Sequence, residues 1–194
     1  MAIRQQIVSF LCLFSGLGLG TSVVADANVS ITVQQVLENT HVAASIQIVA
    51  PHKIVWEVLT DYERLADFVG SLETSRLIEA RNDSTFLVEQ TNISRFAIFK
   101  RRSRVLFVCH HKGRERITTT FIEGDFHANE FEWRLTSEDT GTERVTLTYE
   151  ATVRSIHWAP TWVVHRIVRQ TVEQTLLDVW RESLRRAGTT DPPR

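Results

Sequence analysis

The sequence is 194 residues long, and its 22 Lys and Arg residues nearly balance its 23 Asp and Glu residues, which leaves a formal net charge of −1. With 43% hydrophobic and 23% charged residues, the composition is that of a globular protein and excludes a disordered chain, a collagen or a coiled coil. The balanced charge argues against nucleic acid as a partner, because no positive excess exists to displace counterions from phosphates.

The first residues have the pattern of a secretory signal peptide. Arg4 is followed by an apolar stretch, and the segment ends in Ala25-Asp26-Ala27, which predicts cleavage before Asn28. A retained membrane anchor is the alternative, and the glycines within the apolar stretch disfavour it. We therefore predict export to the periplasm or the outside of the cell. The predicted organisation is a signal peptide at residues 1–27, one domain at residues 28–187 and a disordered tail at residues 188–194.

The beginning of this domain changes from strand to helix. Alternating apolar residues predict a strand at Val42–Val49, and Val29-x-Ile31-x-Val33 fits an earlier strand. Pro51 then stands where a helix can begin, and apolar residues follow it at helical spacing. The capping pattern Thr60-x-x-Glu63 predicts a second short helix from Asp61 to about Phe68.

The rest of the domain predicts a sheet followed by one long helix. Six segments separated by turn-forming residues predict strands at Glu73–Ala80, Thr85–Ile93, Phe96–His110, Glu115–Ile122, Phe126–Leu135 and Glu143–Arg154. The last strand alternates apolar and polar residues, which is typical of an antiparallel sheet with one buried face. An amphipathic helix follows from Thr161 to Arg186, with an apolar stripe at Val164, Val168, Val172, Leu176, Val179 and Leu184. This order predicts an α+β domain whose sheet curls around the final helix.

A longer motif carries a resemblance to a known family. The segment Ala50-Pro51-x-x-x-Val55-Trp56-x-Val58-Leu59-Thr60-Asp61-Tyr62-Glu63 resembles the START-like helix-grip superfamily (SRPBCC), and within it the polyketide cyclase/dehydrase and coenzyme-Q-binding group. Matching pieces follow at Phe68-Val69, Glu89-Gln90, Gly124-Asp125-Phe126, Trp133 and Leu147-Thr148-Tyr149-Glu150. The resemblance covers Val42 to Leu184. It implies a curved antiparallel sheet of about seven strands around the C-terminal helix, two short helices after the first strand, and a hydrophobic cavity.

The candidate cavity residues are mainly aromatic. Large rings offer much apolar contact with few rotatable bonds, and Tyr and Trp keep one polar atom for a ligand. The alternative for each ring is a place in the core. We predict a ligand-binding wall formed by Trp56, Tyr62, Phe68, Gln90, Trp133, Tyr149 and Trp162. Replacing Tyr149 by Phe is expected to leave folding intact and to weaken binding of a ligand with a polar head.

The sequence contains no motif for catalysis, for a metal or for another cofactor. There is no His-Glu-x-x-His segment and no cysteine pair, and the neighbours His110 and His111 point to opposite faces of a strand. His127 and His165 are candidate general bases only if they face the cavity. After cleavage Cys109 is the only cysteine, which predicts a buried thiol and no intrachain disulfide.

One basic cluster stands out from the balanced charge. It contains Arg95, Lys100, Arg101, Arg102 and Arg104. Such a cluster can contact anionic lipid heads at a membrane surface, each cation contributing ~1 kcal/mol when it is close. The alternative is a solvated hairpin whose charges protect a sheet edge.

Three functions remain open on the sequence. The first is an exported protein that binds or carries an apolar small molecule such as a lipid, a quinone or an isoprenoid-like compound. The second is a cyclase or dehydratase acting on a polyketide-like substrate, which needs an acid–base group that faces inward. The third is a protein-interaction domain with a filled core. Because the positions predicted to face inward are almost all apolar, we expect the first.

Overall fold

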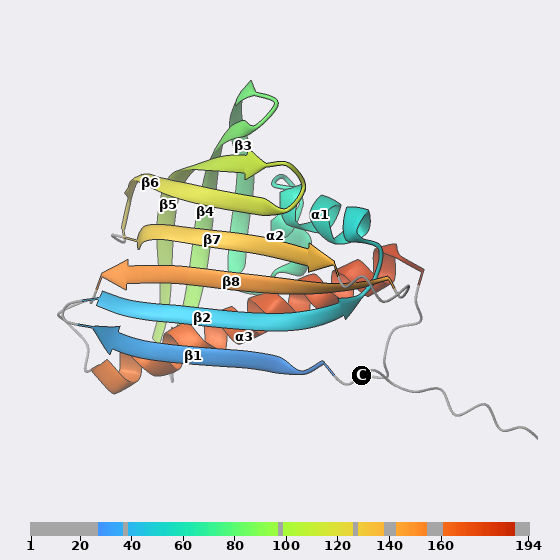
Figure 1. Ribbon diagram of the computed structural model, residues 1–194. Helices are drawn as coiled ribbons and strands as arrows, with labels where there is room; N and C mark the ends of the chain where they lie inside the picture. The colour runs from blue at the N-terminus through green and yellow to red at the C-terminus, as the bar shows by residue number, and fades with distance from the viewer. Residues whose placement is uncertain are drawn as a thin grey trace, which may run out of the picture.

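An eight-stranded antiparallel sheet curves around one long helix in the computed structural model of the chain (Figure 1). The structure describes residues 27–36, 39–96, 99–125, 128–137, 143–154 and 161–188, without the side chains at 94–101, 128, 129 and 154. The predicted signal peptide and tail lie outside these residues, apart from Ala27 and Gly188. In chain order the elements are β1 (Val29–Val36), β2 (Asn39–Val49), α1 (His52–Thr60), α2 (Leu65–Phe68), β3 (Leu72–Asn82), β4 (Thr85–Phe96), β5 (Phe99–Lys112), β6 (Arg116–Gly124), β7 (Ala128–Ser137), β8 (Arg144–Arg154) and α3 (Thr161–Arg186).

The strand order shows how the sheet is assembled. It runs β1-β2-β8-β7-β6-β5-β4-β3, and each neighbouring pair is antiparallel. The segment with α1 and α2 crosses from β2 to the far edge at β3, so that β2 pairs with the last strand. Ile46 of β2 lies opposite Leu147 of β8, and both side chains are fully buried. Figure 1 shows α3 crossing the inner face of this sheet.

The strand prediction needs two corrections. The described residues contain eight strands instead of about seven, because β1 pairs with β2 from Val29 to Val36, and α1 and α2 follow the second strand. Phe96 ends β4 and does not begin the next strand, since it pairs with Phe99 across the hairpin. The predicted limits of the last helix, Thr161 and Arg186, are confirmed.

The second short helix begins later than predicted. It starts at Leu65 and has only four residues. The Thr60 hydroxyl donates a hydrogen bond of 2.9 Å to the carbonyl of Trp56, one turn back in α1. Thr60 therefore ends α1 and does not cap a new helix, so the predicted capping pattern with Glu63 does not form.

Gly124 is required where β5 and β6 meet. Its φ of +150° lies in the region that favours glycine. A Cβ at this position would collide with the carbonyl oxygen of Arg104 and come within 2.9 Å of the Val105 Cα. Next to it, the backbone N–H of Arg104 donates to the Asp125 carboxylate over 2.8 Å. The glycine thus allows β5 and β6 to approach closely beside a register shift.

Side-chain bonds hold the α2 segment against α3. The buried carboxylate of Asp178 accepts a hydrogen bond of 2.9 Å from the Gly70 backbone N–H. The hydroxyls of Ser71 and Thr175 lie 3.2 Å apart, and Arg186 contacts Asp61 at 2.8 Å. These contacts fix the α2 segment as one wall of the space between sheet and helix.

Candidate functional site

An apolar cavity of about 320 Å³ lies between the inner face of the sheet and α3. Its apolar lining residues are Leu59, Leu65, Val69, Leu72, Val105, Phe107, Cys109, Ile117, Phe131, Trp133, Val153, Val164, Ile167, Val168, Val172 and Val179. Its polar lining residues are Tyr62, Ser71, Gln90, Asn92, Tyr149, Thr171 and Thr175. None of the described residues that line the cavity is charged.

The periodicity of each element explains its contribution to this wall. Side chains in a strand alternate between the two faces, so β5 contributes Val105, Phe107 and Cys109 to the cavity. Val168 and Val172 of α3 are only half-buried, although they belong to the apolar stripe. They line the cavity, which leaves part of their surface without packed atoms. The helix stripe therefore serves both as core and as cavity wall.

Four of the seven predicted wall residues line the cavity: Tyr62, Gln90, Trp133 and Tyr149. Ligand binding by them stays a prediction. The other three do not line this cavity. Trp56 is buried in the core with its ring edge-to-face on His111, and Phe68 is half-buried beneath the Arg186 guanidinium. Trp162 is 64% exposed, in the first turn of α3.

Tyr149 presents a hydroxyl group to the apolar wall. Its ring lies 4.5 Å from that of Trp133 and 6.0 Å from that of Phe131, measured between centroids. Among the described residues, none is found to form a hydrogen bond with the Tyr149 hydroxyl. Burial raises the pKa of Tyr149, so the phenol is protonated and neutral at physiological pH.

A second tyrosine on the wall has a partner that sequence analysis missed. The Tyr62 hydroxyl lies 2.6 Å from Nε2 of His111, whose ring packs on Phe86 at 4.5 Å. Burial lowers the pKa of His111 to about 4, and burial together with the Cys109 thiol raises the pKa of Tyr62. Both groups are therefore uncharged at neutral pH. The alternation Val105-x-Phe107-x-Cys109-x-His111 is the signal that would have placed this histidine inward.

The other histidines do not form a second centre within the described residues. His110 is exposed on the opposite face from His111, as predicted. His165 does not line the cavity, and its Nε2 lies 3.4 Å from the side-chain oxygen of Gln35. His127 lies outside the described residues. Within the described ranges, no three His, Cys, Asp or Glu side chains are close enough to hold a metal ion.

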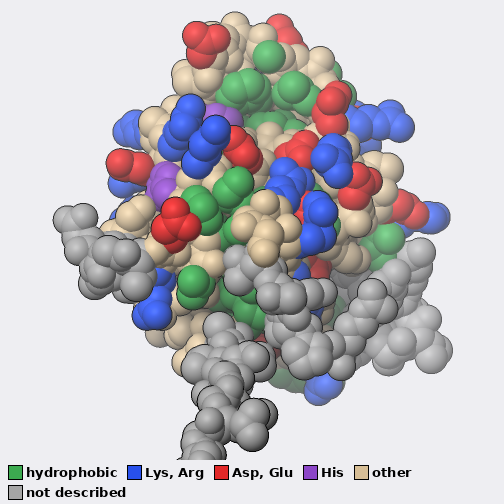
Figure 2. Space-filling model, turned by 90° about the vertical axis from the view of Figure 1, so that its right-hand side faces the viewer, with side chains coloured by type: hydrophobic (Ala, Val, Ile, Leu, Met, Phe, Trp, Pro, Cys, Tyr) green, Lys and Arg blue, Asp and Glu red, His purple; other side chains and the backbone are tan. Residues whose placement is uncertain are grey.

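The basic cluster is partly neutralised by acidic side chains. Arg102 forms two hydrogen bonds of 2.6 Å with Glu73. Arg104 contacts Glu89 at 2.6 Å and Glu123 at 3.2 Å. The side chains of the remaining three cluster residues are not described. Elsewhere positive and negative side chains are mixed, as Figure 2 shows for one face of the molecule.

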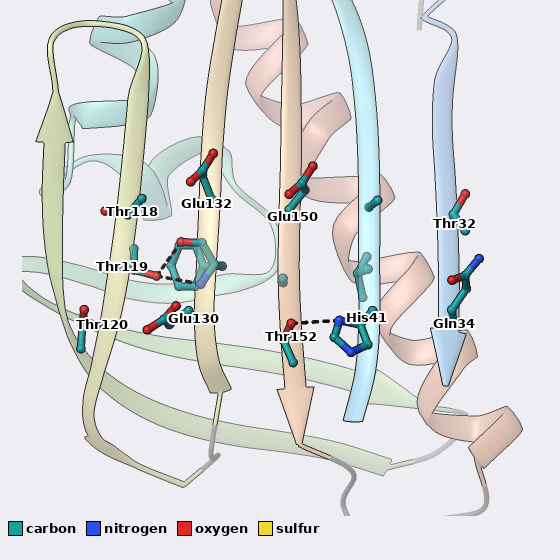
Figure 3. A pocket seen from close by; sticks show the side chains of 14 residues that line it. Thr32, Gln34, His41, Thr118, Thr119, Thr120, Glu130, Glu132, Glu150 and Thr152 are labelled. Atoms are coloured by element: carbon teal, nitrogen blue, oxygen red, sulfur yellow. Dashed lines mark hydrogen bonds between the residues drawn. The ribbon is translucent and has the colours of Figure 1, made fainter. Parts of the chain in front are cut away.

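A second depression, of about 700 Å³, lies on the outer face of the sheet, opposite α3 (Figure 3). Its lining is polar and includes Thr32, Gln34, His41, Thr118, Thr120, Glu130, Glu132, Glu150 and Thr152. Glu132 is held by Arg134 at 2.6 Å and by Arg116 at 3.4 Å. Because small-molecule sites enclose their ligands in mostly apolar surroundings, the inner cavity is the better candidate.

The curved sheet, the long helix and the apolar cavity between them define a START-like helix-grip domain. Residues 48–179 match the model of the family described as polyketide cyclase/dehydrase and lipid transport, and the chain belongs to this family. In the described part of the chain, no helix is long and apolar enough to span a membrane.

Solved structures agree with this fold. The Zhui aromatase/cyclase from Streptomyces sp. R1128 is 20% identical, with a TM-score of 0.61 over 76% of this chain and 95% of that one. A STAR-related lipid transfer protein from Xanthomonas axonopodis is 18% identical, with a TM-score of 0.57 over 78% and 90%. Human StAR-related lipid transfer protein 5 is 12% identical, with a TM-score of 0.63 over 81% and 82%. No curated protein matches the sequence.

Proposed function

We propose that this protein binds and carries an apolar small molecule in the cavity between the sheet and α3. The observation that supports this proposal is the mainly apolar wall around a volume of about 320 Å³. A cavity of this kind is typical of small-molecule sites, whereas an interaction domain would fill the same space with side chains. A lipid, a quinone and an isoprenoid-like compound are the cargo classes that fit an apolar wall.

Native mass spectrometry of the protein, purified from cells that express the full chain, tests the proposal. We expect a stoichiometric adduct that organic extraction releases and identifies. Protein without ligand that also takes up nothing from a lipid extract would contradict a carrier function. The Val168→Phe variant discussed below provides a matched protein with a smaller cavity.

An enzyme is the second candidate, and the short Tyr62–His111 contact is the observation that favours it. A general acid or base works best when its pKa lies near the working pH. The pKa of His111 is about 4, and the pKa of Tyr62 is raised by burial, so neither group is poised to exchange a proton at neutral pH. Binding therefore agrees better with this chemistry. If the protein turned over a polyketide-like substrate and Tyr62→Phe abolished this turnover, an enzyme would become the better candidate.

We propose that the protein acts after export, to the periplasm or the outside of the cell. The basic, apolar and Ala-x-Ala segments of residues 1–27 support this proposal. Mass spectrometry of the protein recovered from the exported fraction tests it, and we expect a mature chain that begins at Asn28. Recovery of the intact N-terminus in the membrane fraction would indicate an anchor instead.

We also propose that the basic cluster touches an anionic membrane surface when cargo is exchanged. The charges of Arg95, Lys100 and Arg101 support this proposal, while Arg102 and Arg104 are already paired with carboxylates. Sedimentation with vesicles of phosphatidylglycerol or of phosphatidylcholine tests it. We expect binding to the anionic vesicles that is lost in Lys100→Glu/Arg101→Glu and kept in Arg114→Glu. Equal binding of all three proteins would contradict the contact.

A further inference from the structure

The polar groups in the cavity are all neutral. Ser71, Gln90, Asn92, Thr171 and Thr175 carry hydroxyl or amide groups, and no Lys, Arg, Asp, Glu or His of the described residues lines the wall. A carboxylate or a phosphate that entered this space would lose its hydration without gaining an opposite charge. The wall therefore disfavours fatty acids and phospholipid heads.

The size of the cavity sets a second limit on the ligand. Its volume of about 320 Å³ lies at the lower end of the range found for small-molecule pockets. Such a space suits one chain or a few fused rings. The rings of Phe131, Trp133 and Tyr149 pack together along it.

Among the described residues, no hydrogen-bond partner is found for the Tyr149 hydroxyl, the Asn92 amide or the Thr171 hydroxyl of the cavity wall. Tyr149 differs from the other two because its ring lies in the aromatic part of the wall, beside Phe131 and Trp133. Ala44, its neighbour on β2, has no polar side-chain atom to offer. The Tyr62 hydroxyl, in contrast, is already bonded to His111 at 2.6 Å. Since polar groups in apolar surroundings are rarely left without a hydrogen bond, the Tyr149 hydroxyl is available to a molecule that packs against these rings. A phenol can donate to a carbonyl oxygen or accept from a hydroxyl group.

We propose that the cavity selects a small uncharged amphiphile with a hydroxyl or carbonyl group on an apolar body, and that this group hydrogen-bonds to Tyr149. This assignment rests on the proposed function and deepens it. It names the chemical class of the cargo and the residue that orients it. Apolar contact supplies most of the affinity, and Tyr149 supplies the preference for one polar atom.

Three probe molecules that share the same alkyl chain but differ in their polar head group test the class of ligand. The purified full-length protein is loaded with the fluorescent apolar probe 1-aminoanthracene at neutral pH. Its displacement by 1-dodecanol, dodecanoate and dodecane is then measured. We expect 1-dodecanol to bind about tenfold more tightly than dodecanoate, because the carboxylate enters without a countercharge. Dodecanoate binding as tightly as 1-dodecanol would overturn the proposal.

A Tyr→Phe variant in the wall tests the residue. Tyr149→Phe is expected to lower the affinity for 1-dodecanol about fivefold and to leave dodecane unchanged, because it removes one hydrogen bond and no apolar surface. Thr120→Val is the control, since it removes an exposed hydroxyl from the outer face of the sheet, and we expect it to keep the preference for the alcohol over dodecane. Circular dichroism confirms that each variant is folded. An unchanged preference in Tyr149→Phe would overturn the assignment to Tyr149.

The outcomes separate this inference from the proposed function. If none of the three probes displaces the fluorophore, both the proposed function and this assignment fail. If all three displace it equally well, the cavity binds apolar molecules but the assignment fails. The affinities of the three probes are compared in the unmodified protein. The class of ligand is therefore tested even if a variant does not fold.

Discussion

At the scale of single residues, β5 places two histidines in different chemical surroundings. His110 is exposed, while the next residue, His111, packs among the rings of Trp56, Tyr62 and Phe86. The alternation of strand side chains alone separates them. Burial then lowers the pKa of His111 to about 4, and this depression links folding to pH.

His111 is expected to make stability depend on pH. Its pKa falls from 6.5 to about 4 on folding, so between these values the unfolded chain binds the proton and the folded chain does not. Stability is therefore complete above the unfolded value and declines as the pH falls toward the folded one. We expect the midpoint of thermal unfolding to fall less between about pH 7 and pH 5 in His111→Gln than in the unmodified protein. His110→Gln should behave like the unmodified protein, and an equal fall in all three would contradict the role of His111.

A second prediction at this scale concerns glycine. Gly113 and Gly124 both have a positive φ, but a Cβ meets nothing within 4 Å at Gly113 and collides with Arg104 at Gly124. Gly113→Ala is expected to lower the free energy of unfolding by about 1 kcal/mol, the cost of the backbone conformation. Gly124→Ala is expected to lower it by about 3 kcal/mol, because steric overlap adds to that cost. Urea unfolding measures both, and similar losses would show that β5 can move away from β6.

At the scale of elements, α3 joins the helical crossover to the sheet. Its apolar stripe packs against the core at Leu176 and Val179, which are fully buried. Asp178, on the same turn, receives hydrogen bonds from the Gly70 backbone, Gln174 and Arg181. One helix thus closes the core with one set of residues and positions the cavity wall with another.

Removing the Asp178 carboxylate is expected to loosen this junction. Asp178→Ala removes the charged acceptor that the Gly70 N–H, Gln174 and Arg181 share, which we expect to lower the free energy of unfolding by about 2 kcal/mol. Asp178→Asn keeps an acceptor oxygen and should recover most of this loss. Glu173→Ala, at an exposed position of the same helix, is the control and should have little effect. Equal losses in the Ala and Asn variants would assign the stabilisation to the charge near Arg181 instead of the bond to Gly70.

At the scale of the whole molecule, the cavity exists because no single element can fill it. The sheet curves, α3 is straight, and the wall residues between them leave about 320 Å³ unfilled. Unfilled apolar volume costs stability, since the lining atoms lose dispersion contacts. A bound molecule restores these contacts, so ligand binding and stability are linked in this protein.

A larger side chain that fills the cavity is expected to weaken ligand binding and to raise the stability of the protein. Val168→Phe places a ring in the cavity, and we expect it to weaken 1-aminoanthracene binding about tenfold while it raises the free energy of unfolding by about 1 kcal/mol. Arg169→Phe adds the same ring at the exposed neighbouring position and should leave binding unchanged. Fluorescence titration and urea unfolding measure the two effects. Full binding by Val168→Phe would show that the ligand lies elsewhere.

Local patterns predicted most elements because they depend on neighbours along the chain. The stripe of α3 repeats at helical spacing over 26 residues, and its limits were predicted correctly. The alternation in β8 likewise identified Tyr149 as an inward residue. The predicted start of α2 was wrong, because the local pattern does not show whether the Thr60 hydroxyl caps a new helix or bonds back to the Trp56 carbonyl.

The sequence by itself determined the class of fold, the buried face of β8 and the position of four of the seven predicted wall residues in the cavity, because periodicity is a local property. Only the tertiary structure decided which aromatic residues belong to the core and which to the cavity. Trp56 in α1 and Trp133 in β7 were both predicted to line the cavity, yet one packs on His111 and the other lines the wall. It also brought Tyr62 to His111 across 49 residues and placed Tyr149 beside Phe131 and Trp133 in the wall. These properties depend on the distance between elements, and the packing of the curved sheet against α3 sets that distance.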